Sequence, residues 1–266
     1  MSERREFPVA GIVGVINLMN EKPDVLRYAA TVDDALRMGE EYRAAGFSGL
    51  DIGAQSSHYA VRRMSAQEQI DRLVPVVEAL TADGHPVAVE TEIGEVIRAC
   101  AEAGAVAANL SGSVRDDEVL REIGELDLMC ITSFTPRDTP FDVDGVDIER
   151  DLRGQYAVGL RANVERLRAA GVRKLIVDSG IGYSYPMPYS EFSKYQVETI
   201  RQTRALGEAF GLPTLVAVPR VPNEWLIAAF TTLAVEYGAS ILRCHDPAVG
   251  EVARLLGFIP GAITSA

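Results

Sequence analysis

The sequence has few of the residues that build disulfide frameworks or metal clusters. Its three cysteines, Cys100, Cys130 and Cys244, show neither CxxC spacing nor any pairing pattern. They stand in apolar segments, which is typical of buried thiols in a reducing compartment. We therefore expect neither structural disulfides nor a cysteine-bound metal.

Long hydrophobic runs and an excess of basic residues are also absent. No apolar run reaches the roughly 18 residues that cross a bilayer, and the N-terminal segment lacks the pattern of a signal peptide. Lys and Arg number 26 against 38 Asp and Glu, a net charge of −12. This charge disfavours binding to nucleic acid or to anionic membranes. We expect a cytoplasmic protein whose partners are small molecules, because a few cations in a cleft can still hold an anionic substrate.

What the chain does contain is a regular alternation of short apolar segments and longer amphipathic ones. The apolar segments are rich in Val and Ile and end in a polar residue or glycine, as strands buried on both faces do. They are residues 8–17, 49–53, 86–91, 105–112, 126–134, 174–182, 214–220 and 240–246. Eight strand–helix units without a linker predict one α/β domain over residues 1–266, a single (β/α)8 TIM barrel.

The segments between the strands carry helical signals. Thr31 precedes one helical pattern, and Ser65 with Glu68 forms a capping-box match before another. Long helices are predicted over about 148–171 and 190–211. The two longest irregular stretches, roughly 18–31 and 135–147, follow strands and should lie over the catalytic face of the barrel.

Polar side chains end five of the predicted strands. They are Asn17, Glu90, Asn109, Asp178, and Arg243 with His245. In a TIM barrel the carboxyl ends of all strands meet at one face, and residues two apart on a strand point to the same side. Two adjacent cations suit a phosphate, and an asparagine oxygen suits a hydrated Mg²⁺. The carboxylates and the second asparagine can receive the N–H groups of an aminopyrimidinone ring, so we predict a heterocycle site with an anion at its rim.

Five segments resemble, in order, the signature segments of the dihydropteroate synthase family. They are GVINL (14–18), LDIGAQSS (50–57), VETEIGEVIRACAEAGAVAANLSG (89–112), IVDSGIGYS (176–184) and ILRCHD (241–246). The resemblance covers nearly the whole chain. It implies a transferase that couples a pterin–CH2–diphosphate to an amine such as p-aminobenzoate with loss of pyrophosphate. It also implies Mg²⁺ bound with the diphosphate and a homodimer through the last helices.

The resemblance also assigns roles to the polar strand ends. Asp178 and Asn109 match the residues that hold the pterin ring, and Glu90 stands where the family usually has aspartate. Asn17 matches the asparagine of the magnesium–diphosphate site, and Arg243 with His245 matches the anion-binding pair. Asn17, Arg243 and His245 are therefore the expected catalytic residues.

The sequence departs from the family pattern on the side of the second substrate. The first loop reads MNEKP (19–23), His58 follows Ser57 where the family has arginine, and Val221 follows Arg220 where it has lysine. We expect Ser57, Tyr183 and Arg220 to bind substrate in an altered amine site. Asp51 also ends an apolar strand, and a supporting role is expected for it.

Two other functions fit parts of the pattern. A methyltetrahydrofolate-binding, methyltransferase-like enzyme shares the barrel and the pterin-binding acid and amide, but it has no need of the cation pair. A non-catalytic pterin-binding homologue fits the missing lysine and first-loop motif, but not the retention of Asn17, Arg243 and His245. The sequence does not identify the amine acceptor, and it leaves open whether the ring is a true pterin.

Overall fold

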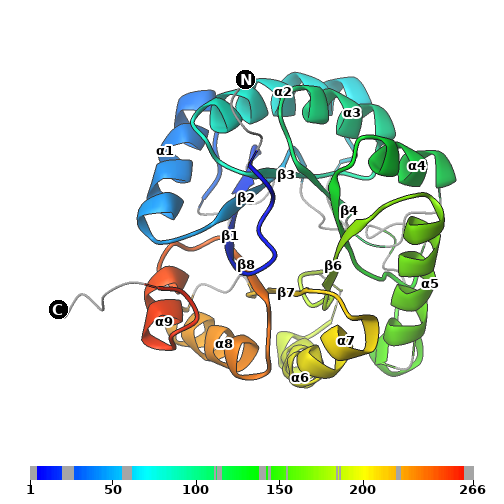
Figure 1. Ribbon diagram of the computed structural model, residues 1–266. Coiled ribbons are helices and arrows are strands. Elements are labelled where there is room, and N and C mark those ends of the chain that lie inside the picture. Colours follow the sequence, from blue (N-terminus) through cyan, green and yellow to red (C-terminus); the bar gives the residue numbers. More distant parts are fainter. Residues whose placement is uncertain are drawn as a thin grey trace.

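The computed structural model describes residues 5–19, 27–55, 62–110, 112, 116–137, 142, 145–153, 155–183, 185, 187–219 and 223–260. Parallel strands β1 to β8 close into a barrel in sequence order, with the helices arranged around it (Figure 1). The predicted TIM barrel is confirmed. The strands are β1 Gly11–Asn17, β2 Gly49–Gly53, β3 Val87–Glu90, β4 Ala107–Leu110, β5 Met129–Thr132, β6 Lys174–Asp178, β7 Thr214–Ala217 and β8 Ile241–Cys244.

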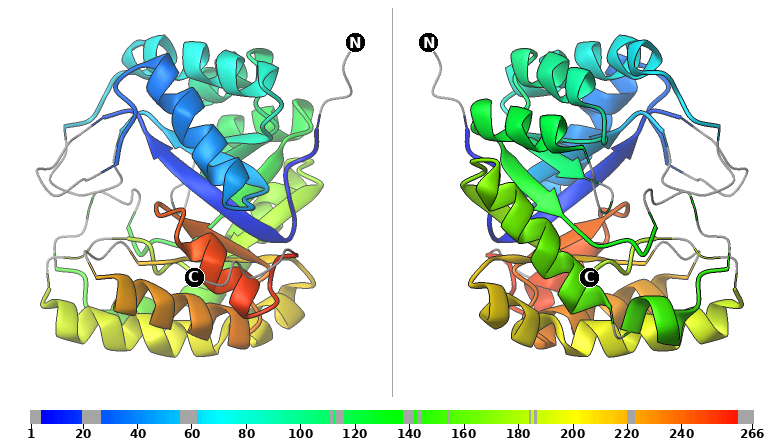
Figure 2. Two further views of the ribbon diagram at one scale, coloured as in Figure 1. Left: turned by 90° about the vertical axis from the view of Figure 1, so that its left-hand side faces the viewer. Right: turned by 90° about the vertical axis from the view of Figure 1, so that its right-hand side faces the viewer.

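The helices flank the strands when the barrel is seen from either side (Figure 2). They are α1 Val32–Ala44, α2 Ala66–Ala82, α3 Gly94–Glu102, α4 Asp117–Glu125, α5 Tyr156–Ala169, α6 Tyr189–Arg201, α7 Thr203–Phe210, α8 Glu224–Glu236 and α9 Val249–Leu255, with a π-helical turn, η1, at Ile148–Arg153. Among the described residues, no helix has both the length and the apolar character needed to cross a membrane.

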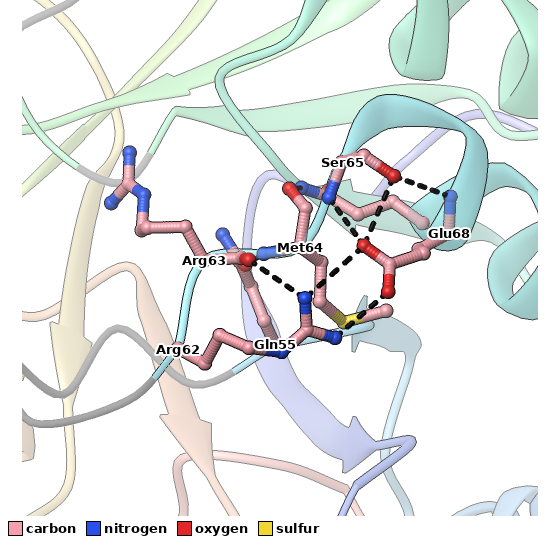
Figure 3. Close-up of polar contacts among 7 residues, drawn as sticks. Gln55, Arg62, Arg63, Met64, Ser65 and Glu68 are labelled. Atoms are coloured by element: carbon pink, nitrogen blue, oxygen red, sulfur yellow. Dashed lines mark hydrogen bonds and ion pairs between the residues drawn. The ribbon is translucent and has the colours of Figure 1, made fainter.

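Capping side chains set the starts of the first two helices, as predicted. The Thr31 hydroxyl accepts from the Asp34 amide at 3.1 Å, and the Asp34 carboxylate accepts from the Thr31 amide in return. Ser65 and Glu68 make the same reciprocal pair at the start of α2, where Arg62 also binds Glu68 (Figure 3). Each box satisfies amide groups that have no partner within the helix.

Two predicted helices are interrupted in the structure. The segment 148–171 divides into η1 and α5, and the segment 190–211 divides at Gln202 into α6 and α7. Sequence periodicity did not reveal these breaks, because buried residues such as Leu152 and Leu160, or Ile200 and Thr203, face inward on both sides of each break. These boundary predictions were therefore wrong.

The lower part of the barrel interior is filled by apolar side chains. One cluster joins Val13, Ala88, Ala107, Ile176 and Ile241 with Phe7, which comes from the segment before β1. The three cysteines are buried and free, and burial raises the pKa of the Cys100 thiol to about 12. The polar residues of the strands lie nearer to the carboxyl ends of the strands than this apolar cluster does.

Candidate active site

Strand geometry places the predicted polar residues inside the mouth of the barrel. Each follows by two positions a residue of the apolar interior cluster: Glu90 follows Ala88, Asn109 follows Ala107, Asp178 follows Ile176 and Arg243 follows Ile241. Residues two apart on a strand share a face. Asp51 pairs in register with Ala88 and therefore shares this inward face. The carboxyl ends of five strands thus contribute polar groups to one compartment.

Four of these residues form a connected network, called here the mouth cluster: Asp51, Glu90, Asn109 and Arg243. Arg243 donates through Nε to Asp51 Oδ2 and through Nη2 to Glu90 Oε2, both at 2.5 Å. Asn109 Nδ2 donates to the same Asp51 oxygen at 2.7 Å. The guanidinium is therefore held between two carboxylates before any ligand binds.

The mouth cluster is largely shielded from solvent. Asp51 is fully buried, and the Glu90 and Arg243 side chains are each 14% exposed. Burial disfavours the charged guanidinium, but the two carboxylates outweigh burial and raise the pKa of Arg243. Asp51 Oδ1 is buried without a hydrogen-bond partner among the described residues. A buried acceptor of this kind is costly unless a ligand or water uses it.

Asp178 lies at the end of β6, within electrostatic range of the mouth cluster. Its Oδ1 accepts from the Gly180 amide at 2.8 Å. The pKa of Asp178 is raised to about 6, mainly by burial; the Gly180 amide and Arg243 lower it, and the Glu90 and Asp51 carboxylates contribute to the rise. Asp178 and Arg243 follow inward-facing residues of β6 and β8, and each affects the pKa of the other, so both belong to the same barrel mouth.

Asn17 stands at the opposite side of Glu90 from Asn109. The register runs from Asn17 through Gly53 and Glu90 to Asn109, so all four share one level of the barrel. A side chain on Gly53 would begin 3.8 Å from both Asn17 Oδ1 and Glu90 Oε2. The glycine thus leaves a gap between the side-chain oxygens of Asn17 and Glu90.

His245 follows the last residue of β8 and is partly buried. Its carbonyl oxygen accepts from the Tyr42 hydroxyl at 2.8 Å, and the same hydroxyl reaches the Val15 carbonyl at 2.9 Å. Tyr42 packs against Gly14, where any side chain would collide with the ring. Helix α1 therefore fixes the backbone at the ends of β1 and β8.

The two tyrosines that follow Asp178 occupy different surroundings. Tyr183 is buried and interacts electrostatically with Asp178 and Glu90, so it lies beside the site. Tyr185 packs edge-on against Phe192, with the ring centroids 5.7 Å apart. Tyr185 is thus part of an aromatic cluster with Phe192 and Tyr195 of α6.

Ser57, His58 and Arg220 lie outside the described residues. Two residues that flank this segment in the sequence are joined, because Gln55 Oε1 accepts from the Met64 amide at 2.9 Å (Figure 3). The supporting role expected for Asp51 agrees with its contacts, because it accepts from both Asn109 and Arg243. The signal in the sequence was a carboxylate near the end of an apolar strand.

Comparison with known proteins agrees with this geometry. The sequence pattern of the family described as pterin binding enzyme matches residues 13–245. The chain is 28% identical over 262 residues to the dihydropteroate synthase of Mycobacterium leprae (strain TN), with 88% of each protein covered. It is 29% identical over 250 residues to a probable bifunctional folylpolyglutamate synthase/dihydropteroate synthase of Halobacterium salinarum (strain ATCC 700922 / JCM 11081 / NRC-1). That match covers 87% of this chain but only 29% of the relative, so the chain spans under a third of the bifunctional protein.

Solved structures show the same barrel. The crystal structure of Yersinia pestis dihydropteroate synthase with a sulfonamide drug complex superposes with a TM-score of 0.80 at 25% identity, covering 93% of each chain. The Thermus thermophilus enzyme in complex with 4-aminobenzoate gives a TM-score of 0.73 at 25% identity, over 93% of this chain and 92% of that one. The chain therefore belongs to the pterin-binding enzyme family, as a transferase of the dihydropteroate synthase type.

Proposed function

We propose that this protein binds a pterin–CH2–diphosphate and joins its CH2 group to an amine, with loss of pyrophosphate. The observation that supports this most directly is that Asp178 and Arg243 both extend from inward-facing rows of β6 and β8 into one barrel mouth. A carboxylate there can accept the N–H groups of the ring, while the cation lies within range of the ring's anionic substituent. One molecule carrying both a heterocycle and a diphosphate would use both groups together.

The ring side consists of acceptors at different depths. Asn109 donates through Nδ2 to Asp51, so its Oδ1 can accept a hydrogen bond from another group. Asp178 keeps one carboxylate oxygen besides the one on Gly180. The buried Asp51 Oδ1 is a third acceptor. We propose that the aminopyrimidinone edge of the pterin satisfies these groups.

The anion side carries less positive charge than the sequence suggested. Asp51 and Glu90 contribute two negative charges against the single positive charge of Arg243, so the mouth cluster has a net charge of −1. A diphosphate would therefore need His245 and a cation besides Arg243. We propose Mg²⁺ for this role, which would neutralise charge on the diphosphate when bound.

The residues fit a magnesium ion that arrives with its ligand. Asn17 Oδ1 borders the gap over Gly53. Among the described residues, no three His, Cys, Asp or Glu side chains are grouped to hold a metal. Mg²⁺ commonly keeps several waters and binds through one or two protein oxygens together with substrate phosphates. Asn17 is the protein oxygen that we propose for it.

The charge arrangement also suits the bond that must break. When the C–O bond to the diphosphate ionises, positive charge develops on the pterin, and the amine then forms a bond to the CH2 carbon and loses a proton. We propose that this charge develops near the carboxylates of Asp51, Glu90 and Asp178, which hydrogen bonds hold in place before reaction. Preorganised charge of this kind stabilises a transition state without a reorganisation cost.

The second substrate would bind on the side of the mouth where the loops differ from the family pattern. Tyr183 lies beside Asp178 and Glu90, and we propose that it borders the amine site together with Ser57 and Arg220. The Thermus relative binds 4-aminobenzoate. We propose an aryl amine for this chain as well, in a site altered by the changed loops.

Calorimetry with Mg²⁺ tests the proposal. A pterin–CH2–diphosphate should bind at least about tenfold more tightly than the hydroxymethyl pterin, because charged contacts are worth over 1 kcal/mol each. Equal affinities would favour the methyltransferase-like alternative, and no pterin binding would refute both. Release of pyrophosphate on addition of 4-aminobenzoate would show the complete reaction and exclude a non-catalytic homologue.

We further propose a homodimer through the last helices, in a reducing cytoplasm that keeps the three cysteines free. On α8, Trp225 is 78% exposed and Leu226 is 38% exposed, and apolar surface of this kind commonly marks an interface. Sedimentation of the protein should give twice the chain mass of 28.8 kDa, and Trp225→Glu should lower it. A monomer at micromolar concentration would refute the dimer.

A further inference from the structure

Tyr156, the first residue of α5, makes three contacts beneath the turn that carries Asp178. Its hydroxyl donates to the main-chain carbonyl of Asp178. Its ring fills the space beside Gly180, whose φ of +76° already favours glycine and where a Cβ would overlap the phenol. Its hydroxyl also lies 3.0 Å from Ser133 Oγ, one residue beyond β5. One buried side chain thus joins the ends of β5 and β6.

The direction of these hydrogen bonds follows from the number of protons. A carbonyl oxygen only accepts, so the single Tyr156 hydroxyl proton goes to Asp178. Ser133 must therefore donate its proton to Tyr156. The hydroxyl groups of Ser133 and Tyr156 therefore form a short chain that ends on the backbone carbonyl of Asp178.

The surroundings hold this chain in place. Ser133 is 1% exposed and Tyr156 is 9% exposed. Asn163, two turns along α5, donates to the Ser133 carbonyl at 2.7 Å, and Tyr156 packs edge-on against Phe134 with the centroids 5.9 Å apart. Both strand ends are therefore tied to the start of one helix. Side-chain networks that are fully satisfied and buried fix a single geometry.

We propose that Tyr156 is a positioning residue, which aims the Asp178 carboxylate into the barrel mouth by holding the Asp178 carbonyl group from the helix side. Ser133 holds the Tyr156 hydroxyl from the end of β5, so the ends of β5 and β6 share one support. The inference rests on the function proposed above, because it gives Asp178 the task of binding the ring. Tyr156 itself touches no reacting atom in this assignment.

Binding of the pterin–CH2–diphosphate with Mg²⁺ to the full chain tests the proposal by calorimetry. Tyr156→Phe removes one buried hydroxyl and should weaken binding about five- to tenfold, the usual effect of one hydrogen bond. The matched control is Tyr195→Phe, which removes a buried phenol hydroxyl from α6 and should leave affinity unchanged. In an Asp178→Asn background, Tyr156→Phe should add almost nothing, because its effect passes through Asp178.

A second measurement needs no ligand. The titration of the Asp178 carboxyl group, followed by NMR on carbon-labelled aspartate, should shift to higher pH in Tyr156→Phe, because the Gly180 amide is no longer held on the carboxylate. If the unmodified protein binds no pterin, the proposed function fails, and this titration still decides the role of Tyr156.

A Tyr156→Phe protein that melts at a lower temperature but keeps the affinity and the Asp178 titration of the unmodified chain would overturn the proposal. If that variant does not fold, Ser133→Ala decides, since it removes only the donor to Tyr156. It should shift both readouts in the same direction by a smaller amount, and unchanged readouts would again overturn the proposal.

Discussion

Glu90 and Arg243 hold each other across the barrel mouth, with Oε2 of one 2.5 Å from Nη2 of the other, although β3 and β8 are not neighbouring strands. The pair spans the opening through which a substrate would enter. Asp51 supports it from β2, which lies between β3 and β1. The guanidinium of Arg243, which we predicted from the sequence to bind an anionic substrate, is therefore already neutralised by carboxylates of the protein.

Glu90→Gln should strengthen the binding of pyrophosphate. The change keeps the shape of the side chain and removes one of the two negative charges on Arg243, so an incoming anion meets less repulsion. We expect pyrophosphate with Mg²⁺ to bind about 3- to 10-fold more tightly, from the Coulomb energy of one charge a few ångströms away at high effective dielectric. Calorimetry measures this. Glu92→Gln is the control, since Glu92 pairs with Arg63 outside the mouth cluster, and equal affinities for both variants would contradict the prediction.

Arg243→Ala should cost the protein stability as well as anion affinity. It leaves the Asp51 and Glu90 carboxylates buried without their cation, and breaking a buried pair from one side typically costs about 3–5 kcal/mol. Urea unfolding measures the loss. Arg173→Ala provides the comparison, because Arg173 is 76% exposed in its pair with Asp127 and surface pairs contribute little. An Arg243→Ala chain as stable as the unmodified one would show that the pairing is not formed in solution.

Much of the fold was predictable from the sequence, and the reason is local. Each strand is an apolar run ended by a polar residue or glycine, and capping residues such as Thr31 and Ser65 mark helix starts directly. The barrel then follows from eight repeats of one unit. The inward direction of Asn109 and Asp178 follows from strand alternation alone.

The connections within the site were not predictable in the same way. The Asn109–Asp51 bond and the Arg243–Glu90 bond join residues 58 and 153 positions apart, and their formation depends on the stagger of the strands around the barrel. Tyr156 looked like an ordinary helix residue, because its role depends on where α5 begins. That start was hidden by a continuous helical pattern through η1.

Binding of the ring should weaken in acid with a midpoint set by Asp178. The pKa of Asp178 is raised to about 6, first of all by burial, so the carboxylate that accepts ring N–H groups is ionised at pH 7 and mostly protonated at pH 5. Affinity for the pterin should be flat above pH 7 and about tenfold weaker at pH 5, since each pH unit below the pKa costs a factor of ten. Calorimetry across this range measures the profile. Asp178→Asn should bind weakly at every pH, and a profile in the unmodified protein without this drop would exclude Asp178 as the acceptor.

A second pH effect should arise at the C-terminal end of α1, where the side chain of His85 is buried against Arg43 and Asp83. His85 Nε2 lies 2.8 Å from Arg43 Nη2 and 3.2 Å from Asp83 Oδ2. The guanidinium can only donate, so the closer contact favours a neutral imidazole that accepts at Nε2. Burial lowers the pKa of His85, and Arg43 lowers it further, although Asp83 and Glu40 oppose this. The unfolded chain therefore binds a proton near pH 6.5 that the folded chain does not. Stability is complete above that pH and is lost as the pH falls through it, by up to about 1.4 kcal/mol per unit.

His85→Gln separates this effect from the titration of Asp178, which has the opposite sign. Because the folded-state pKa of Asp178 is raised, the folded chain binds the extra proton between about pH 4 and 6, and that group adds stability as the pH falls. The Asp178 contribution is common to both proteins and cancels when the variant is compared with the unmodified chain. Urea unfolding at pH 7.5 and 5.5 should therefore show a smaller loss of stability in His85→Gln than in the unmodified chain. Equal losses in the two proteins would mean that His85 becomes protonated in the folded state, with the Arg43 contact broken.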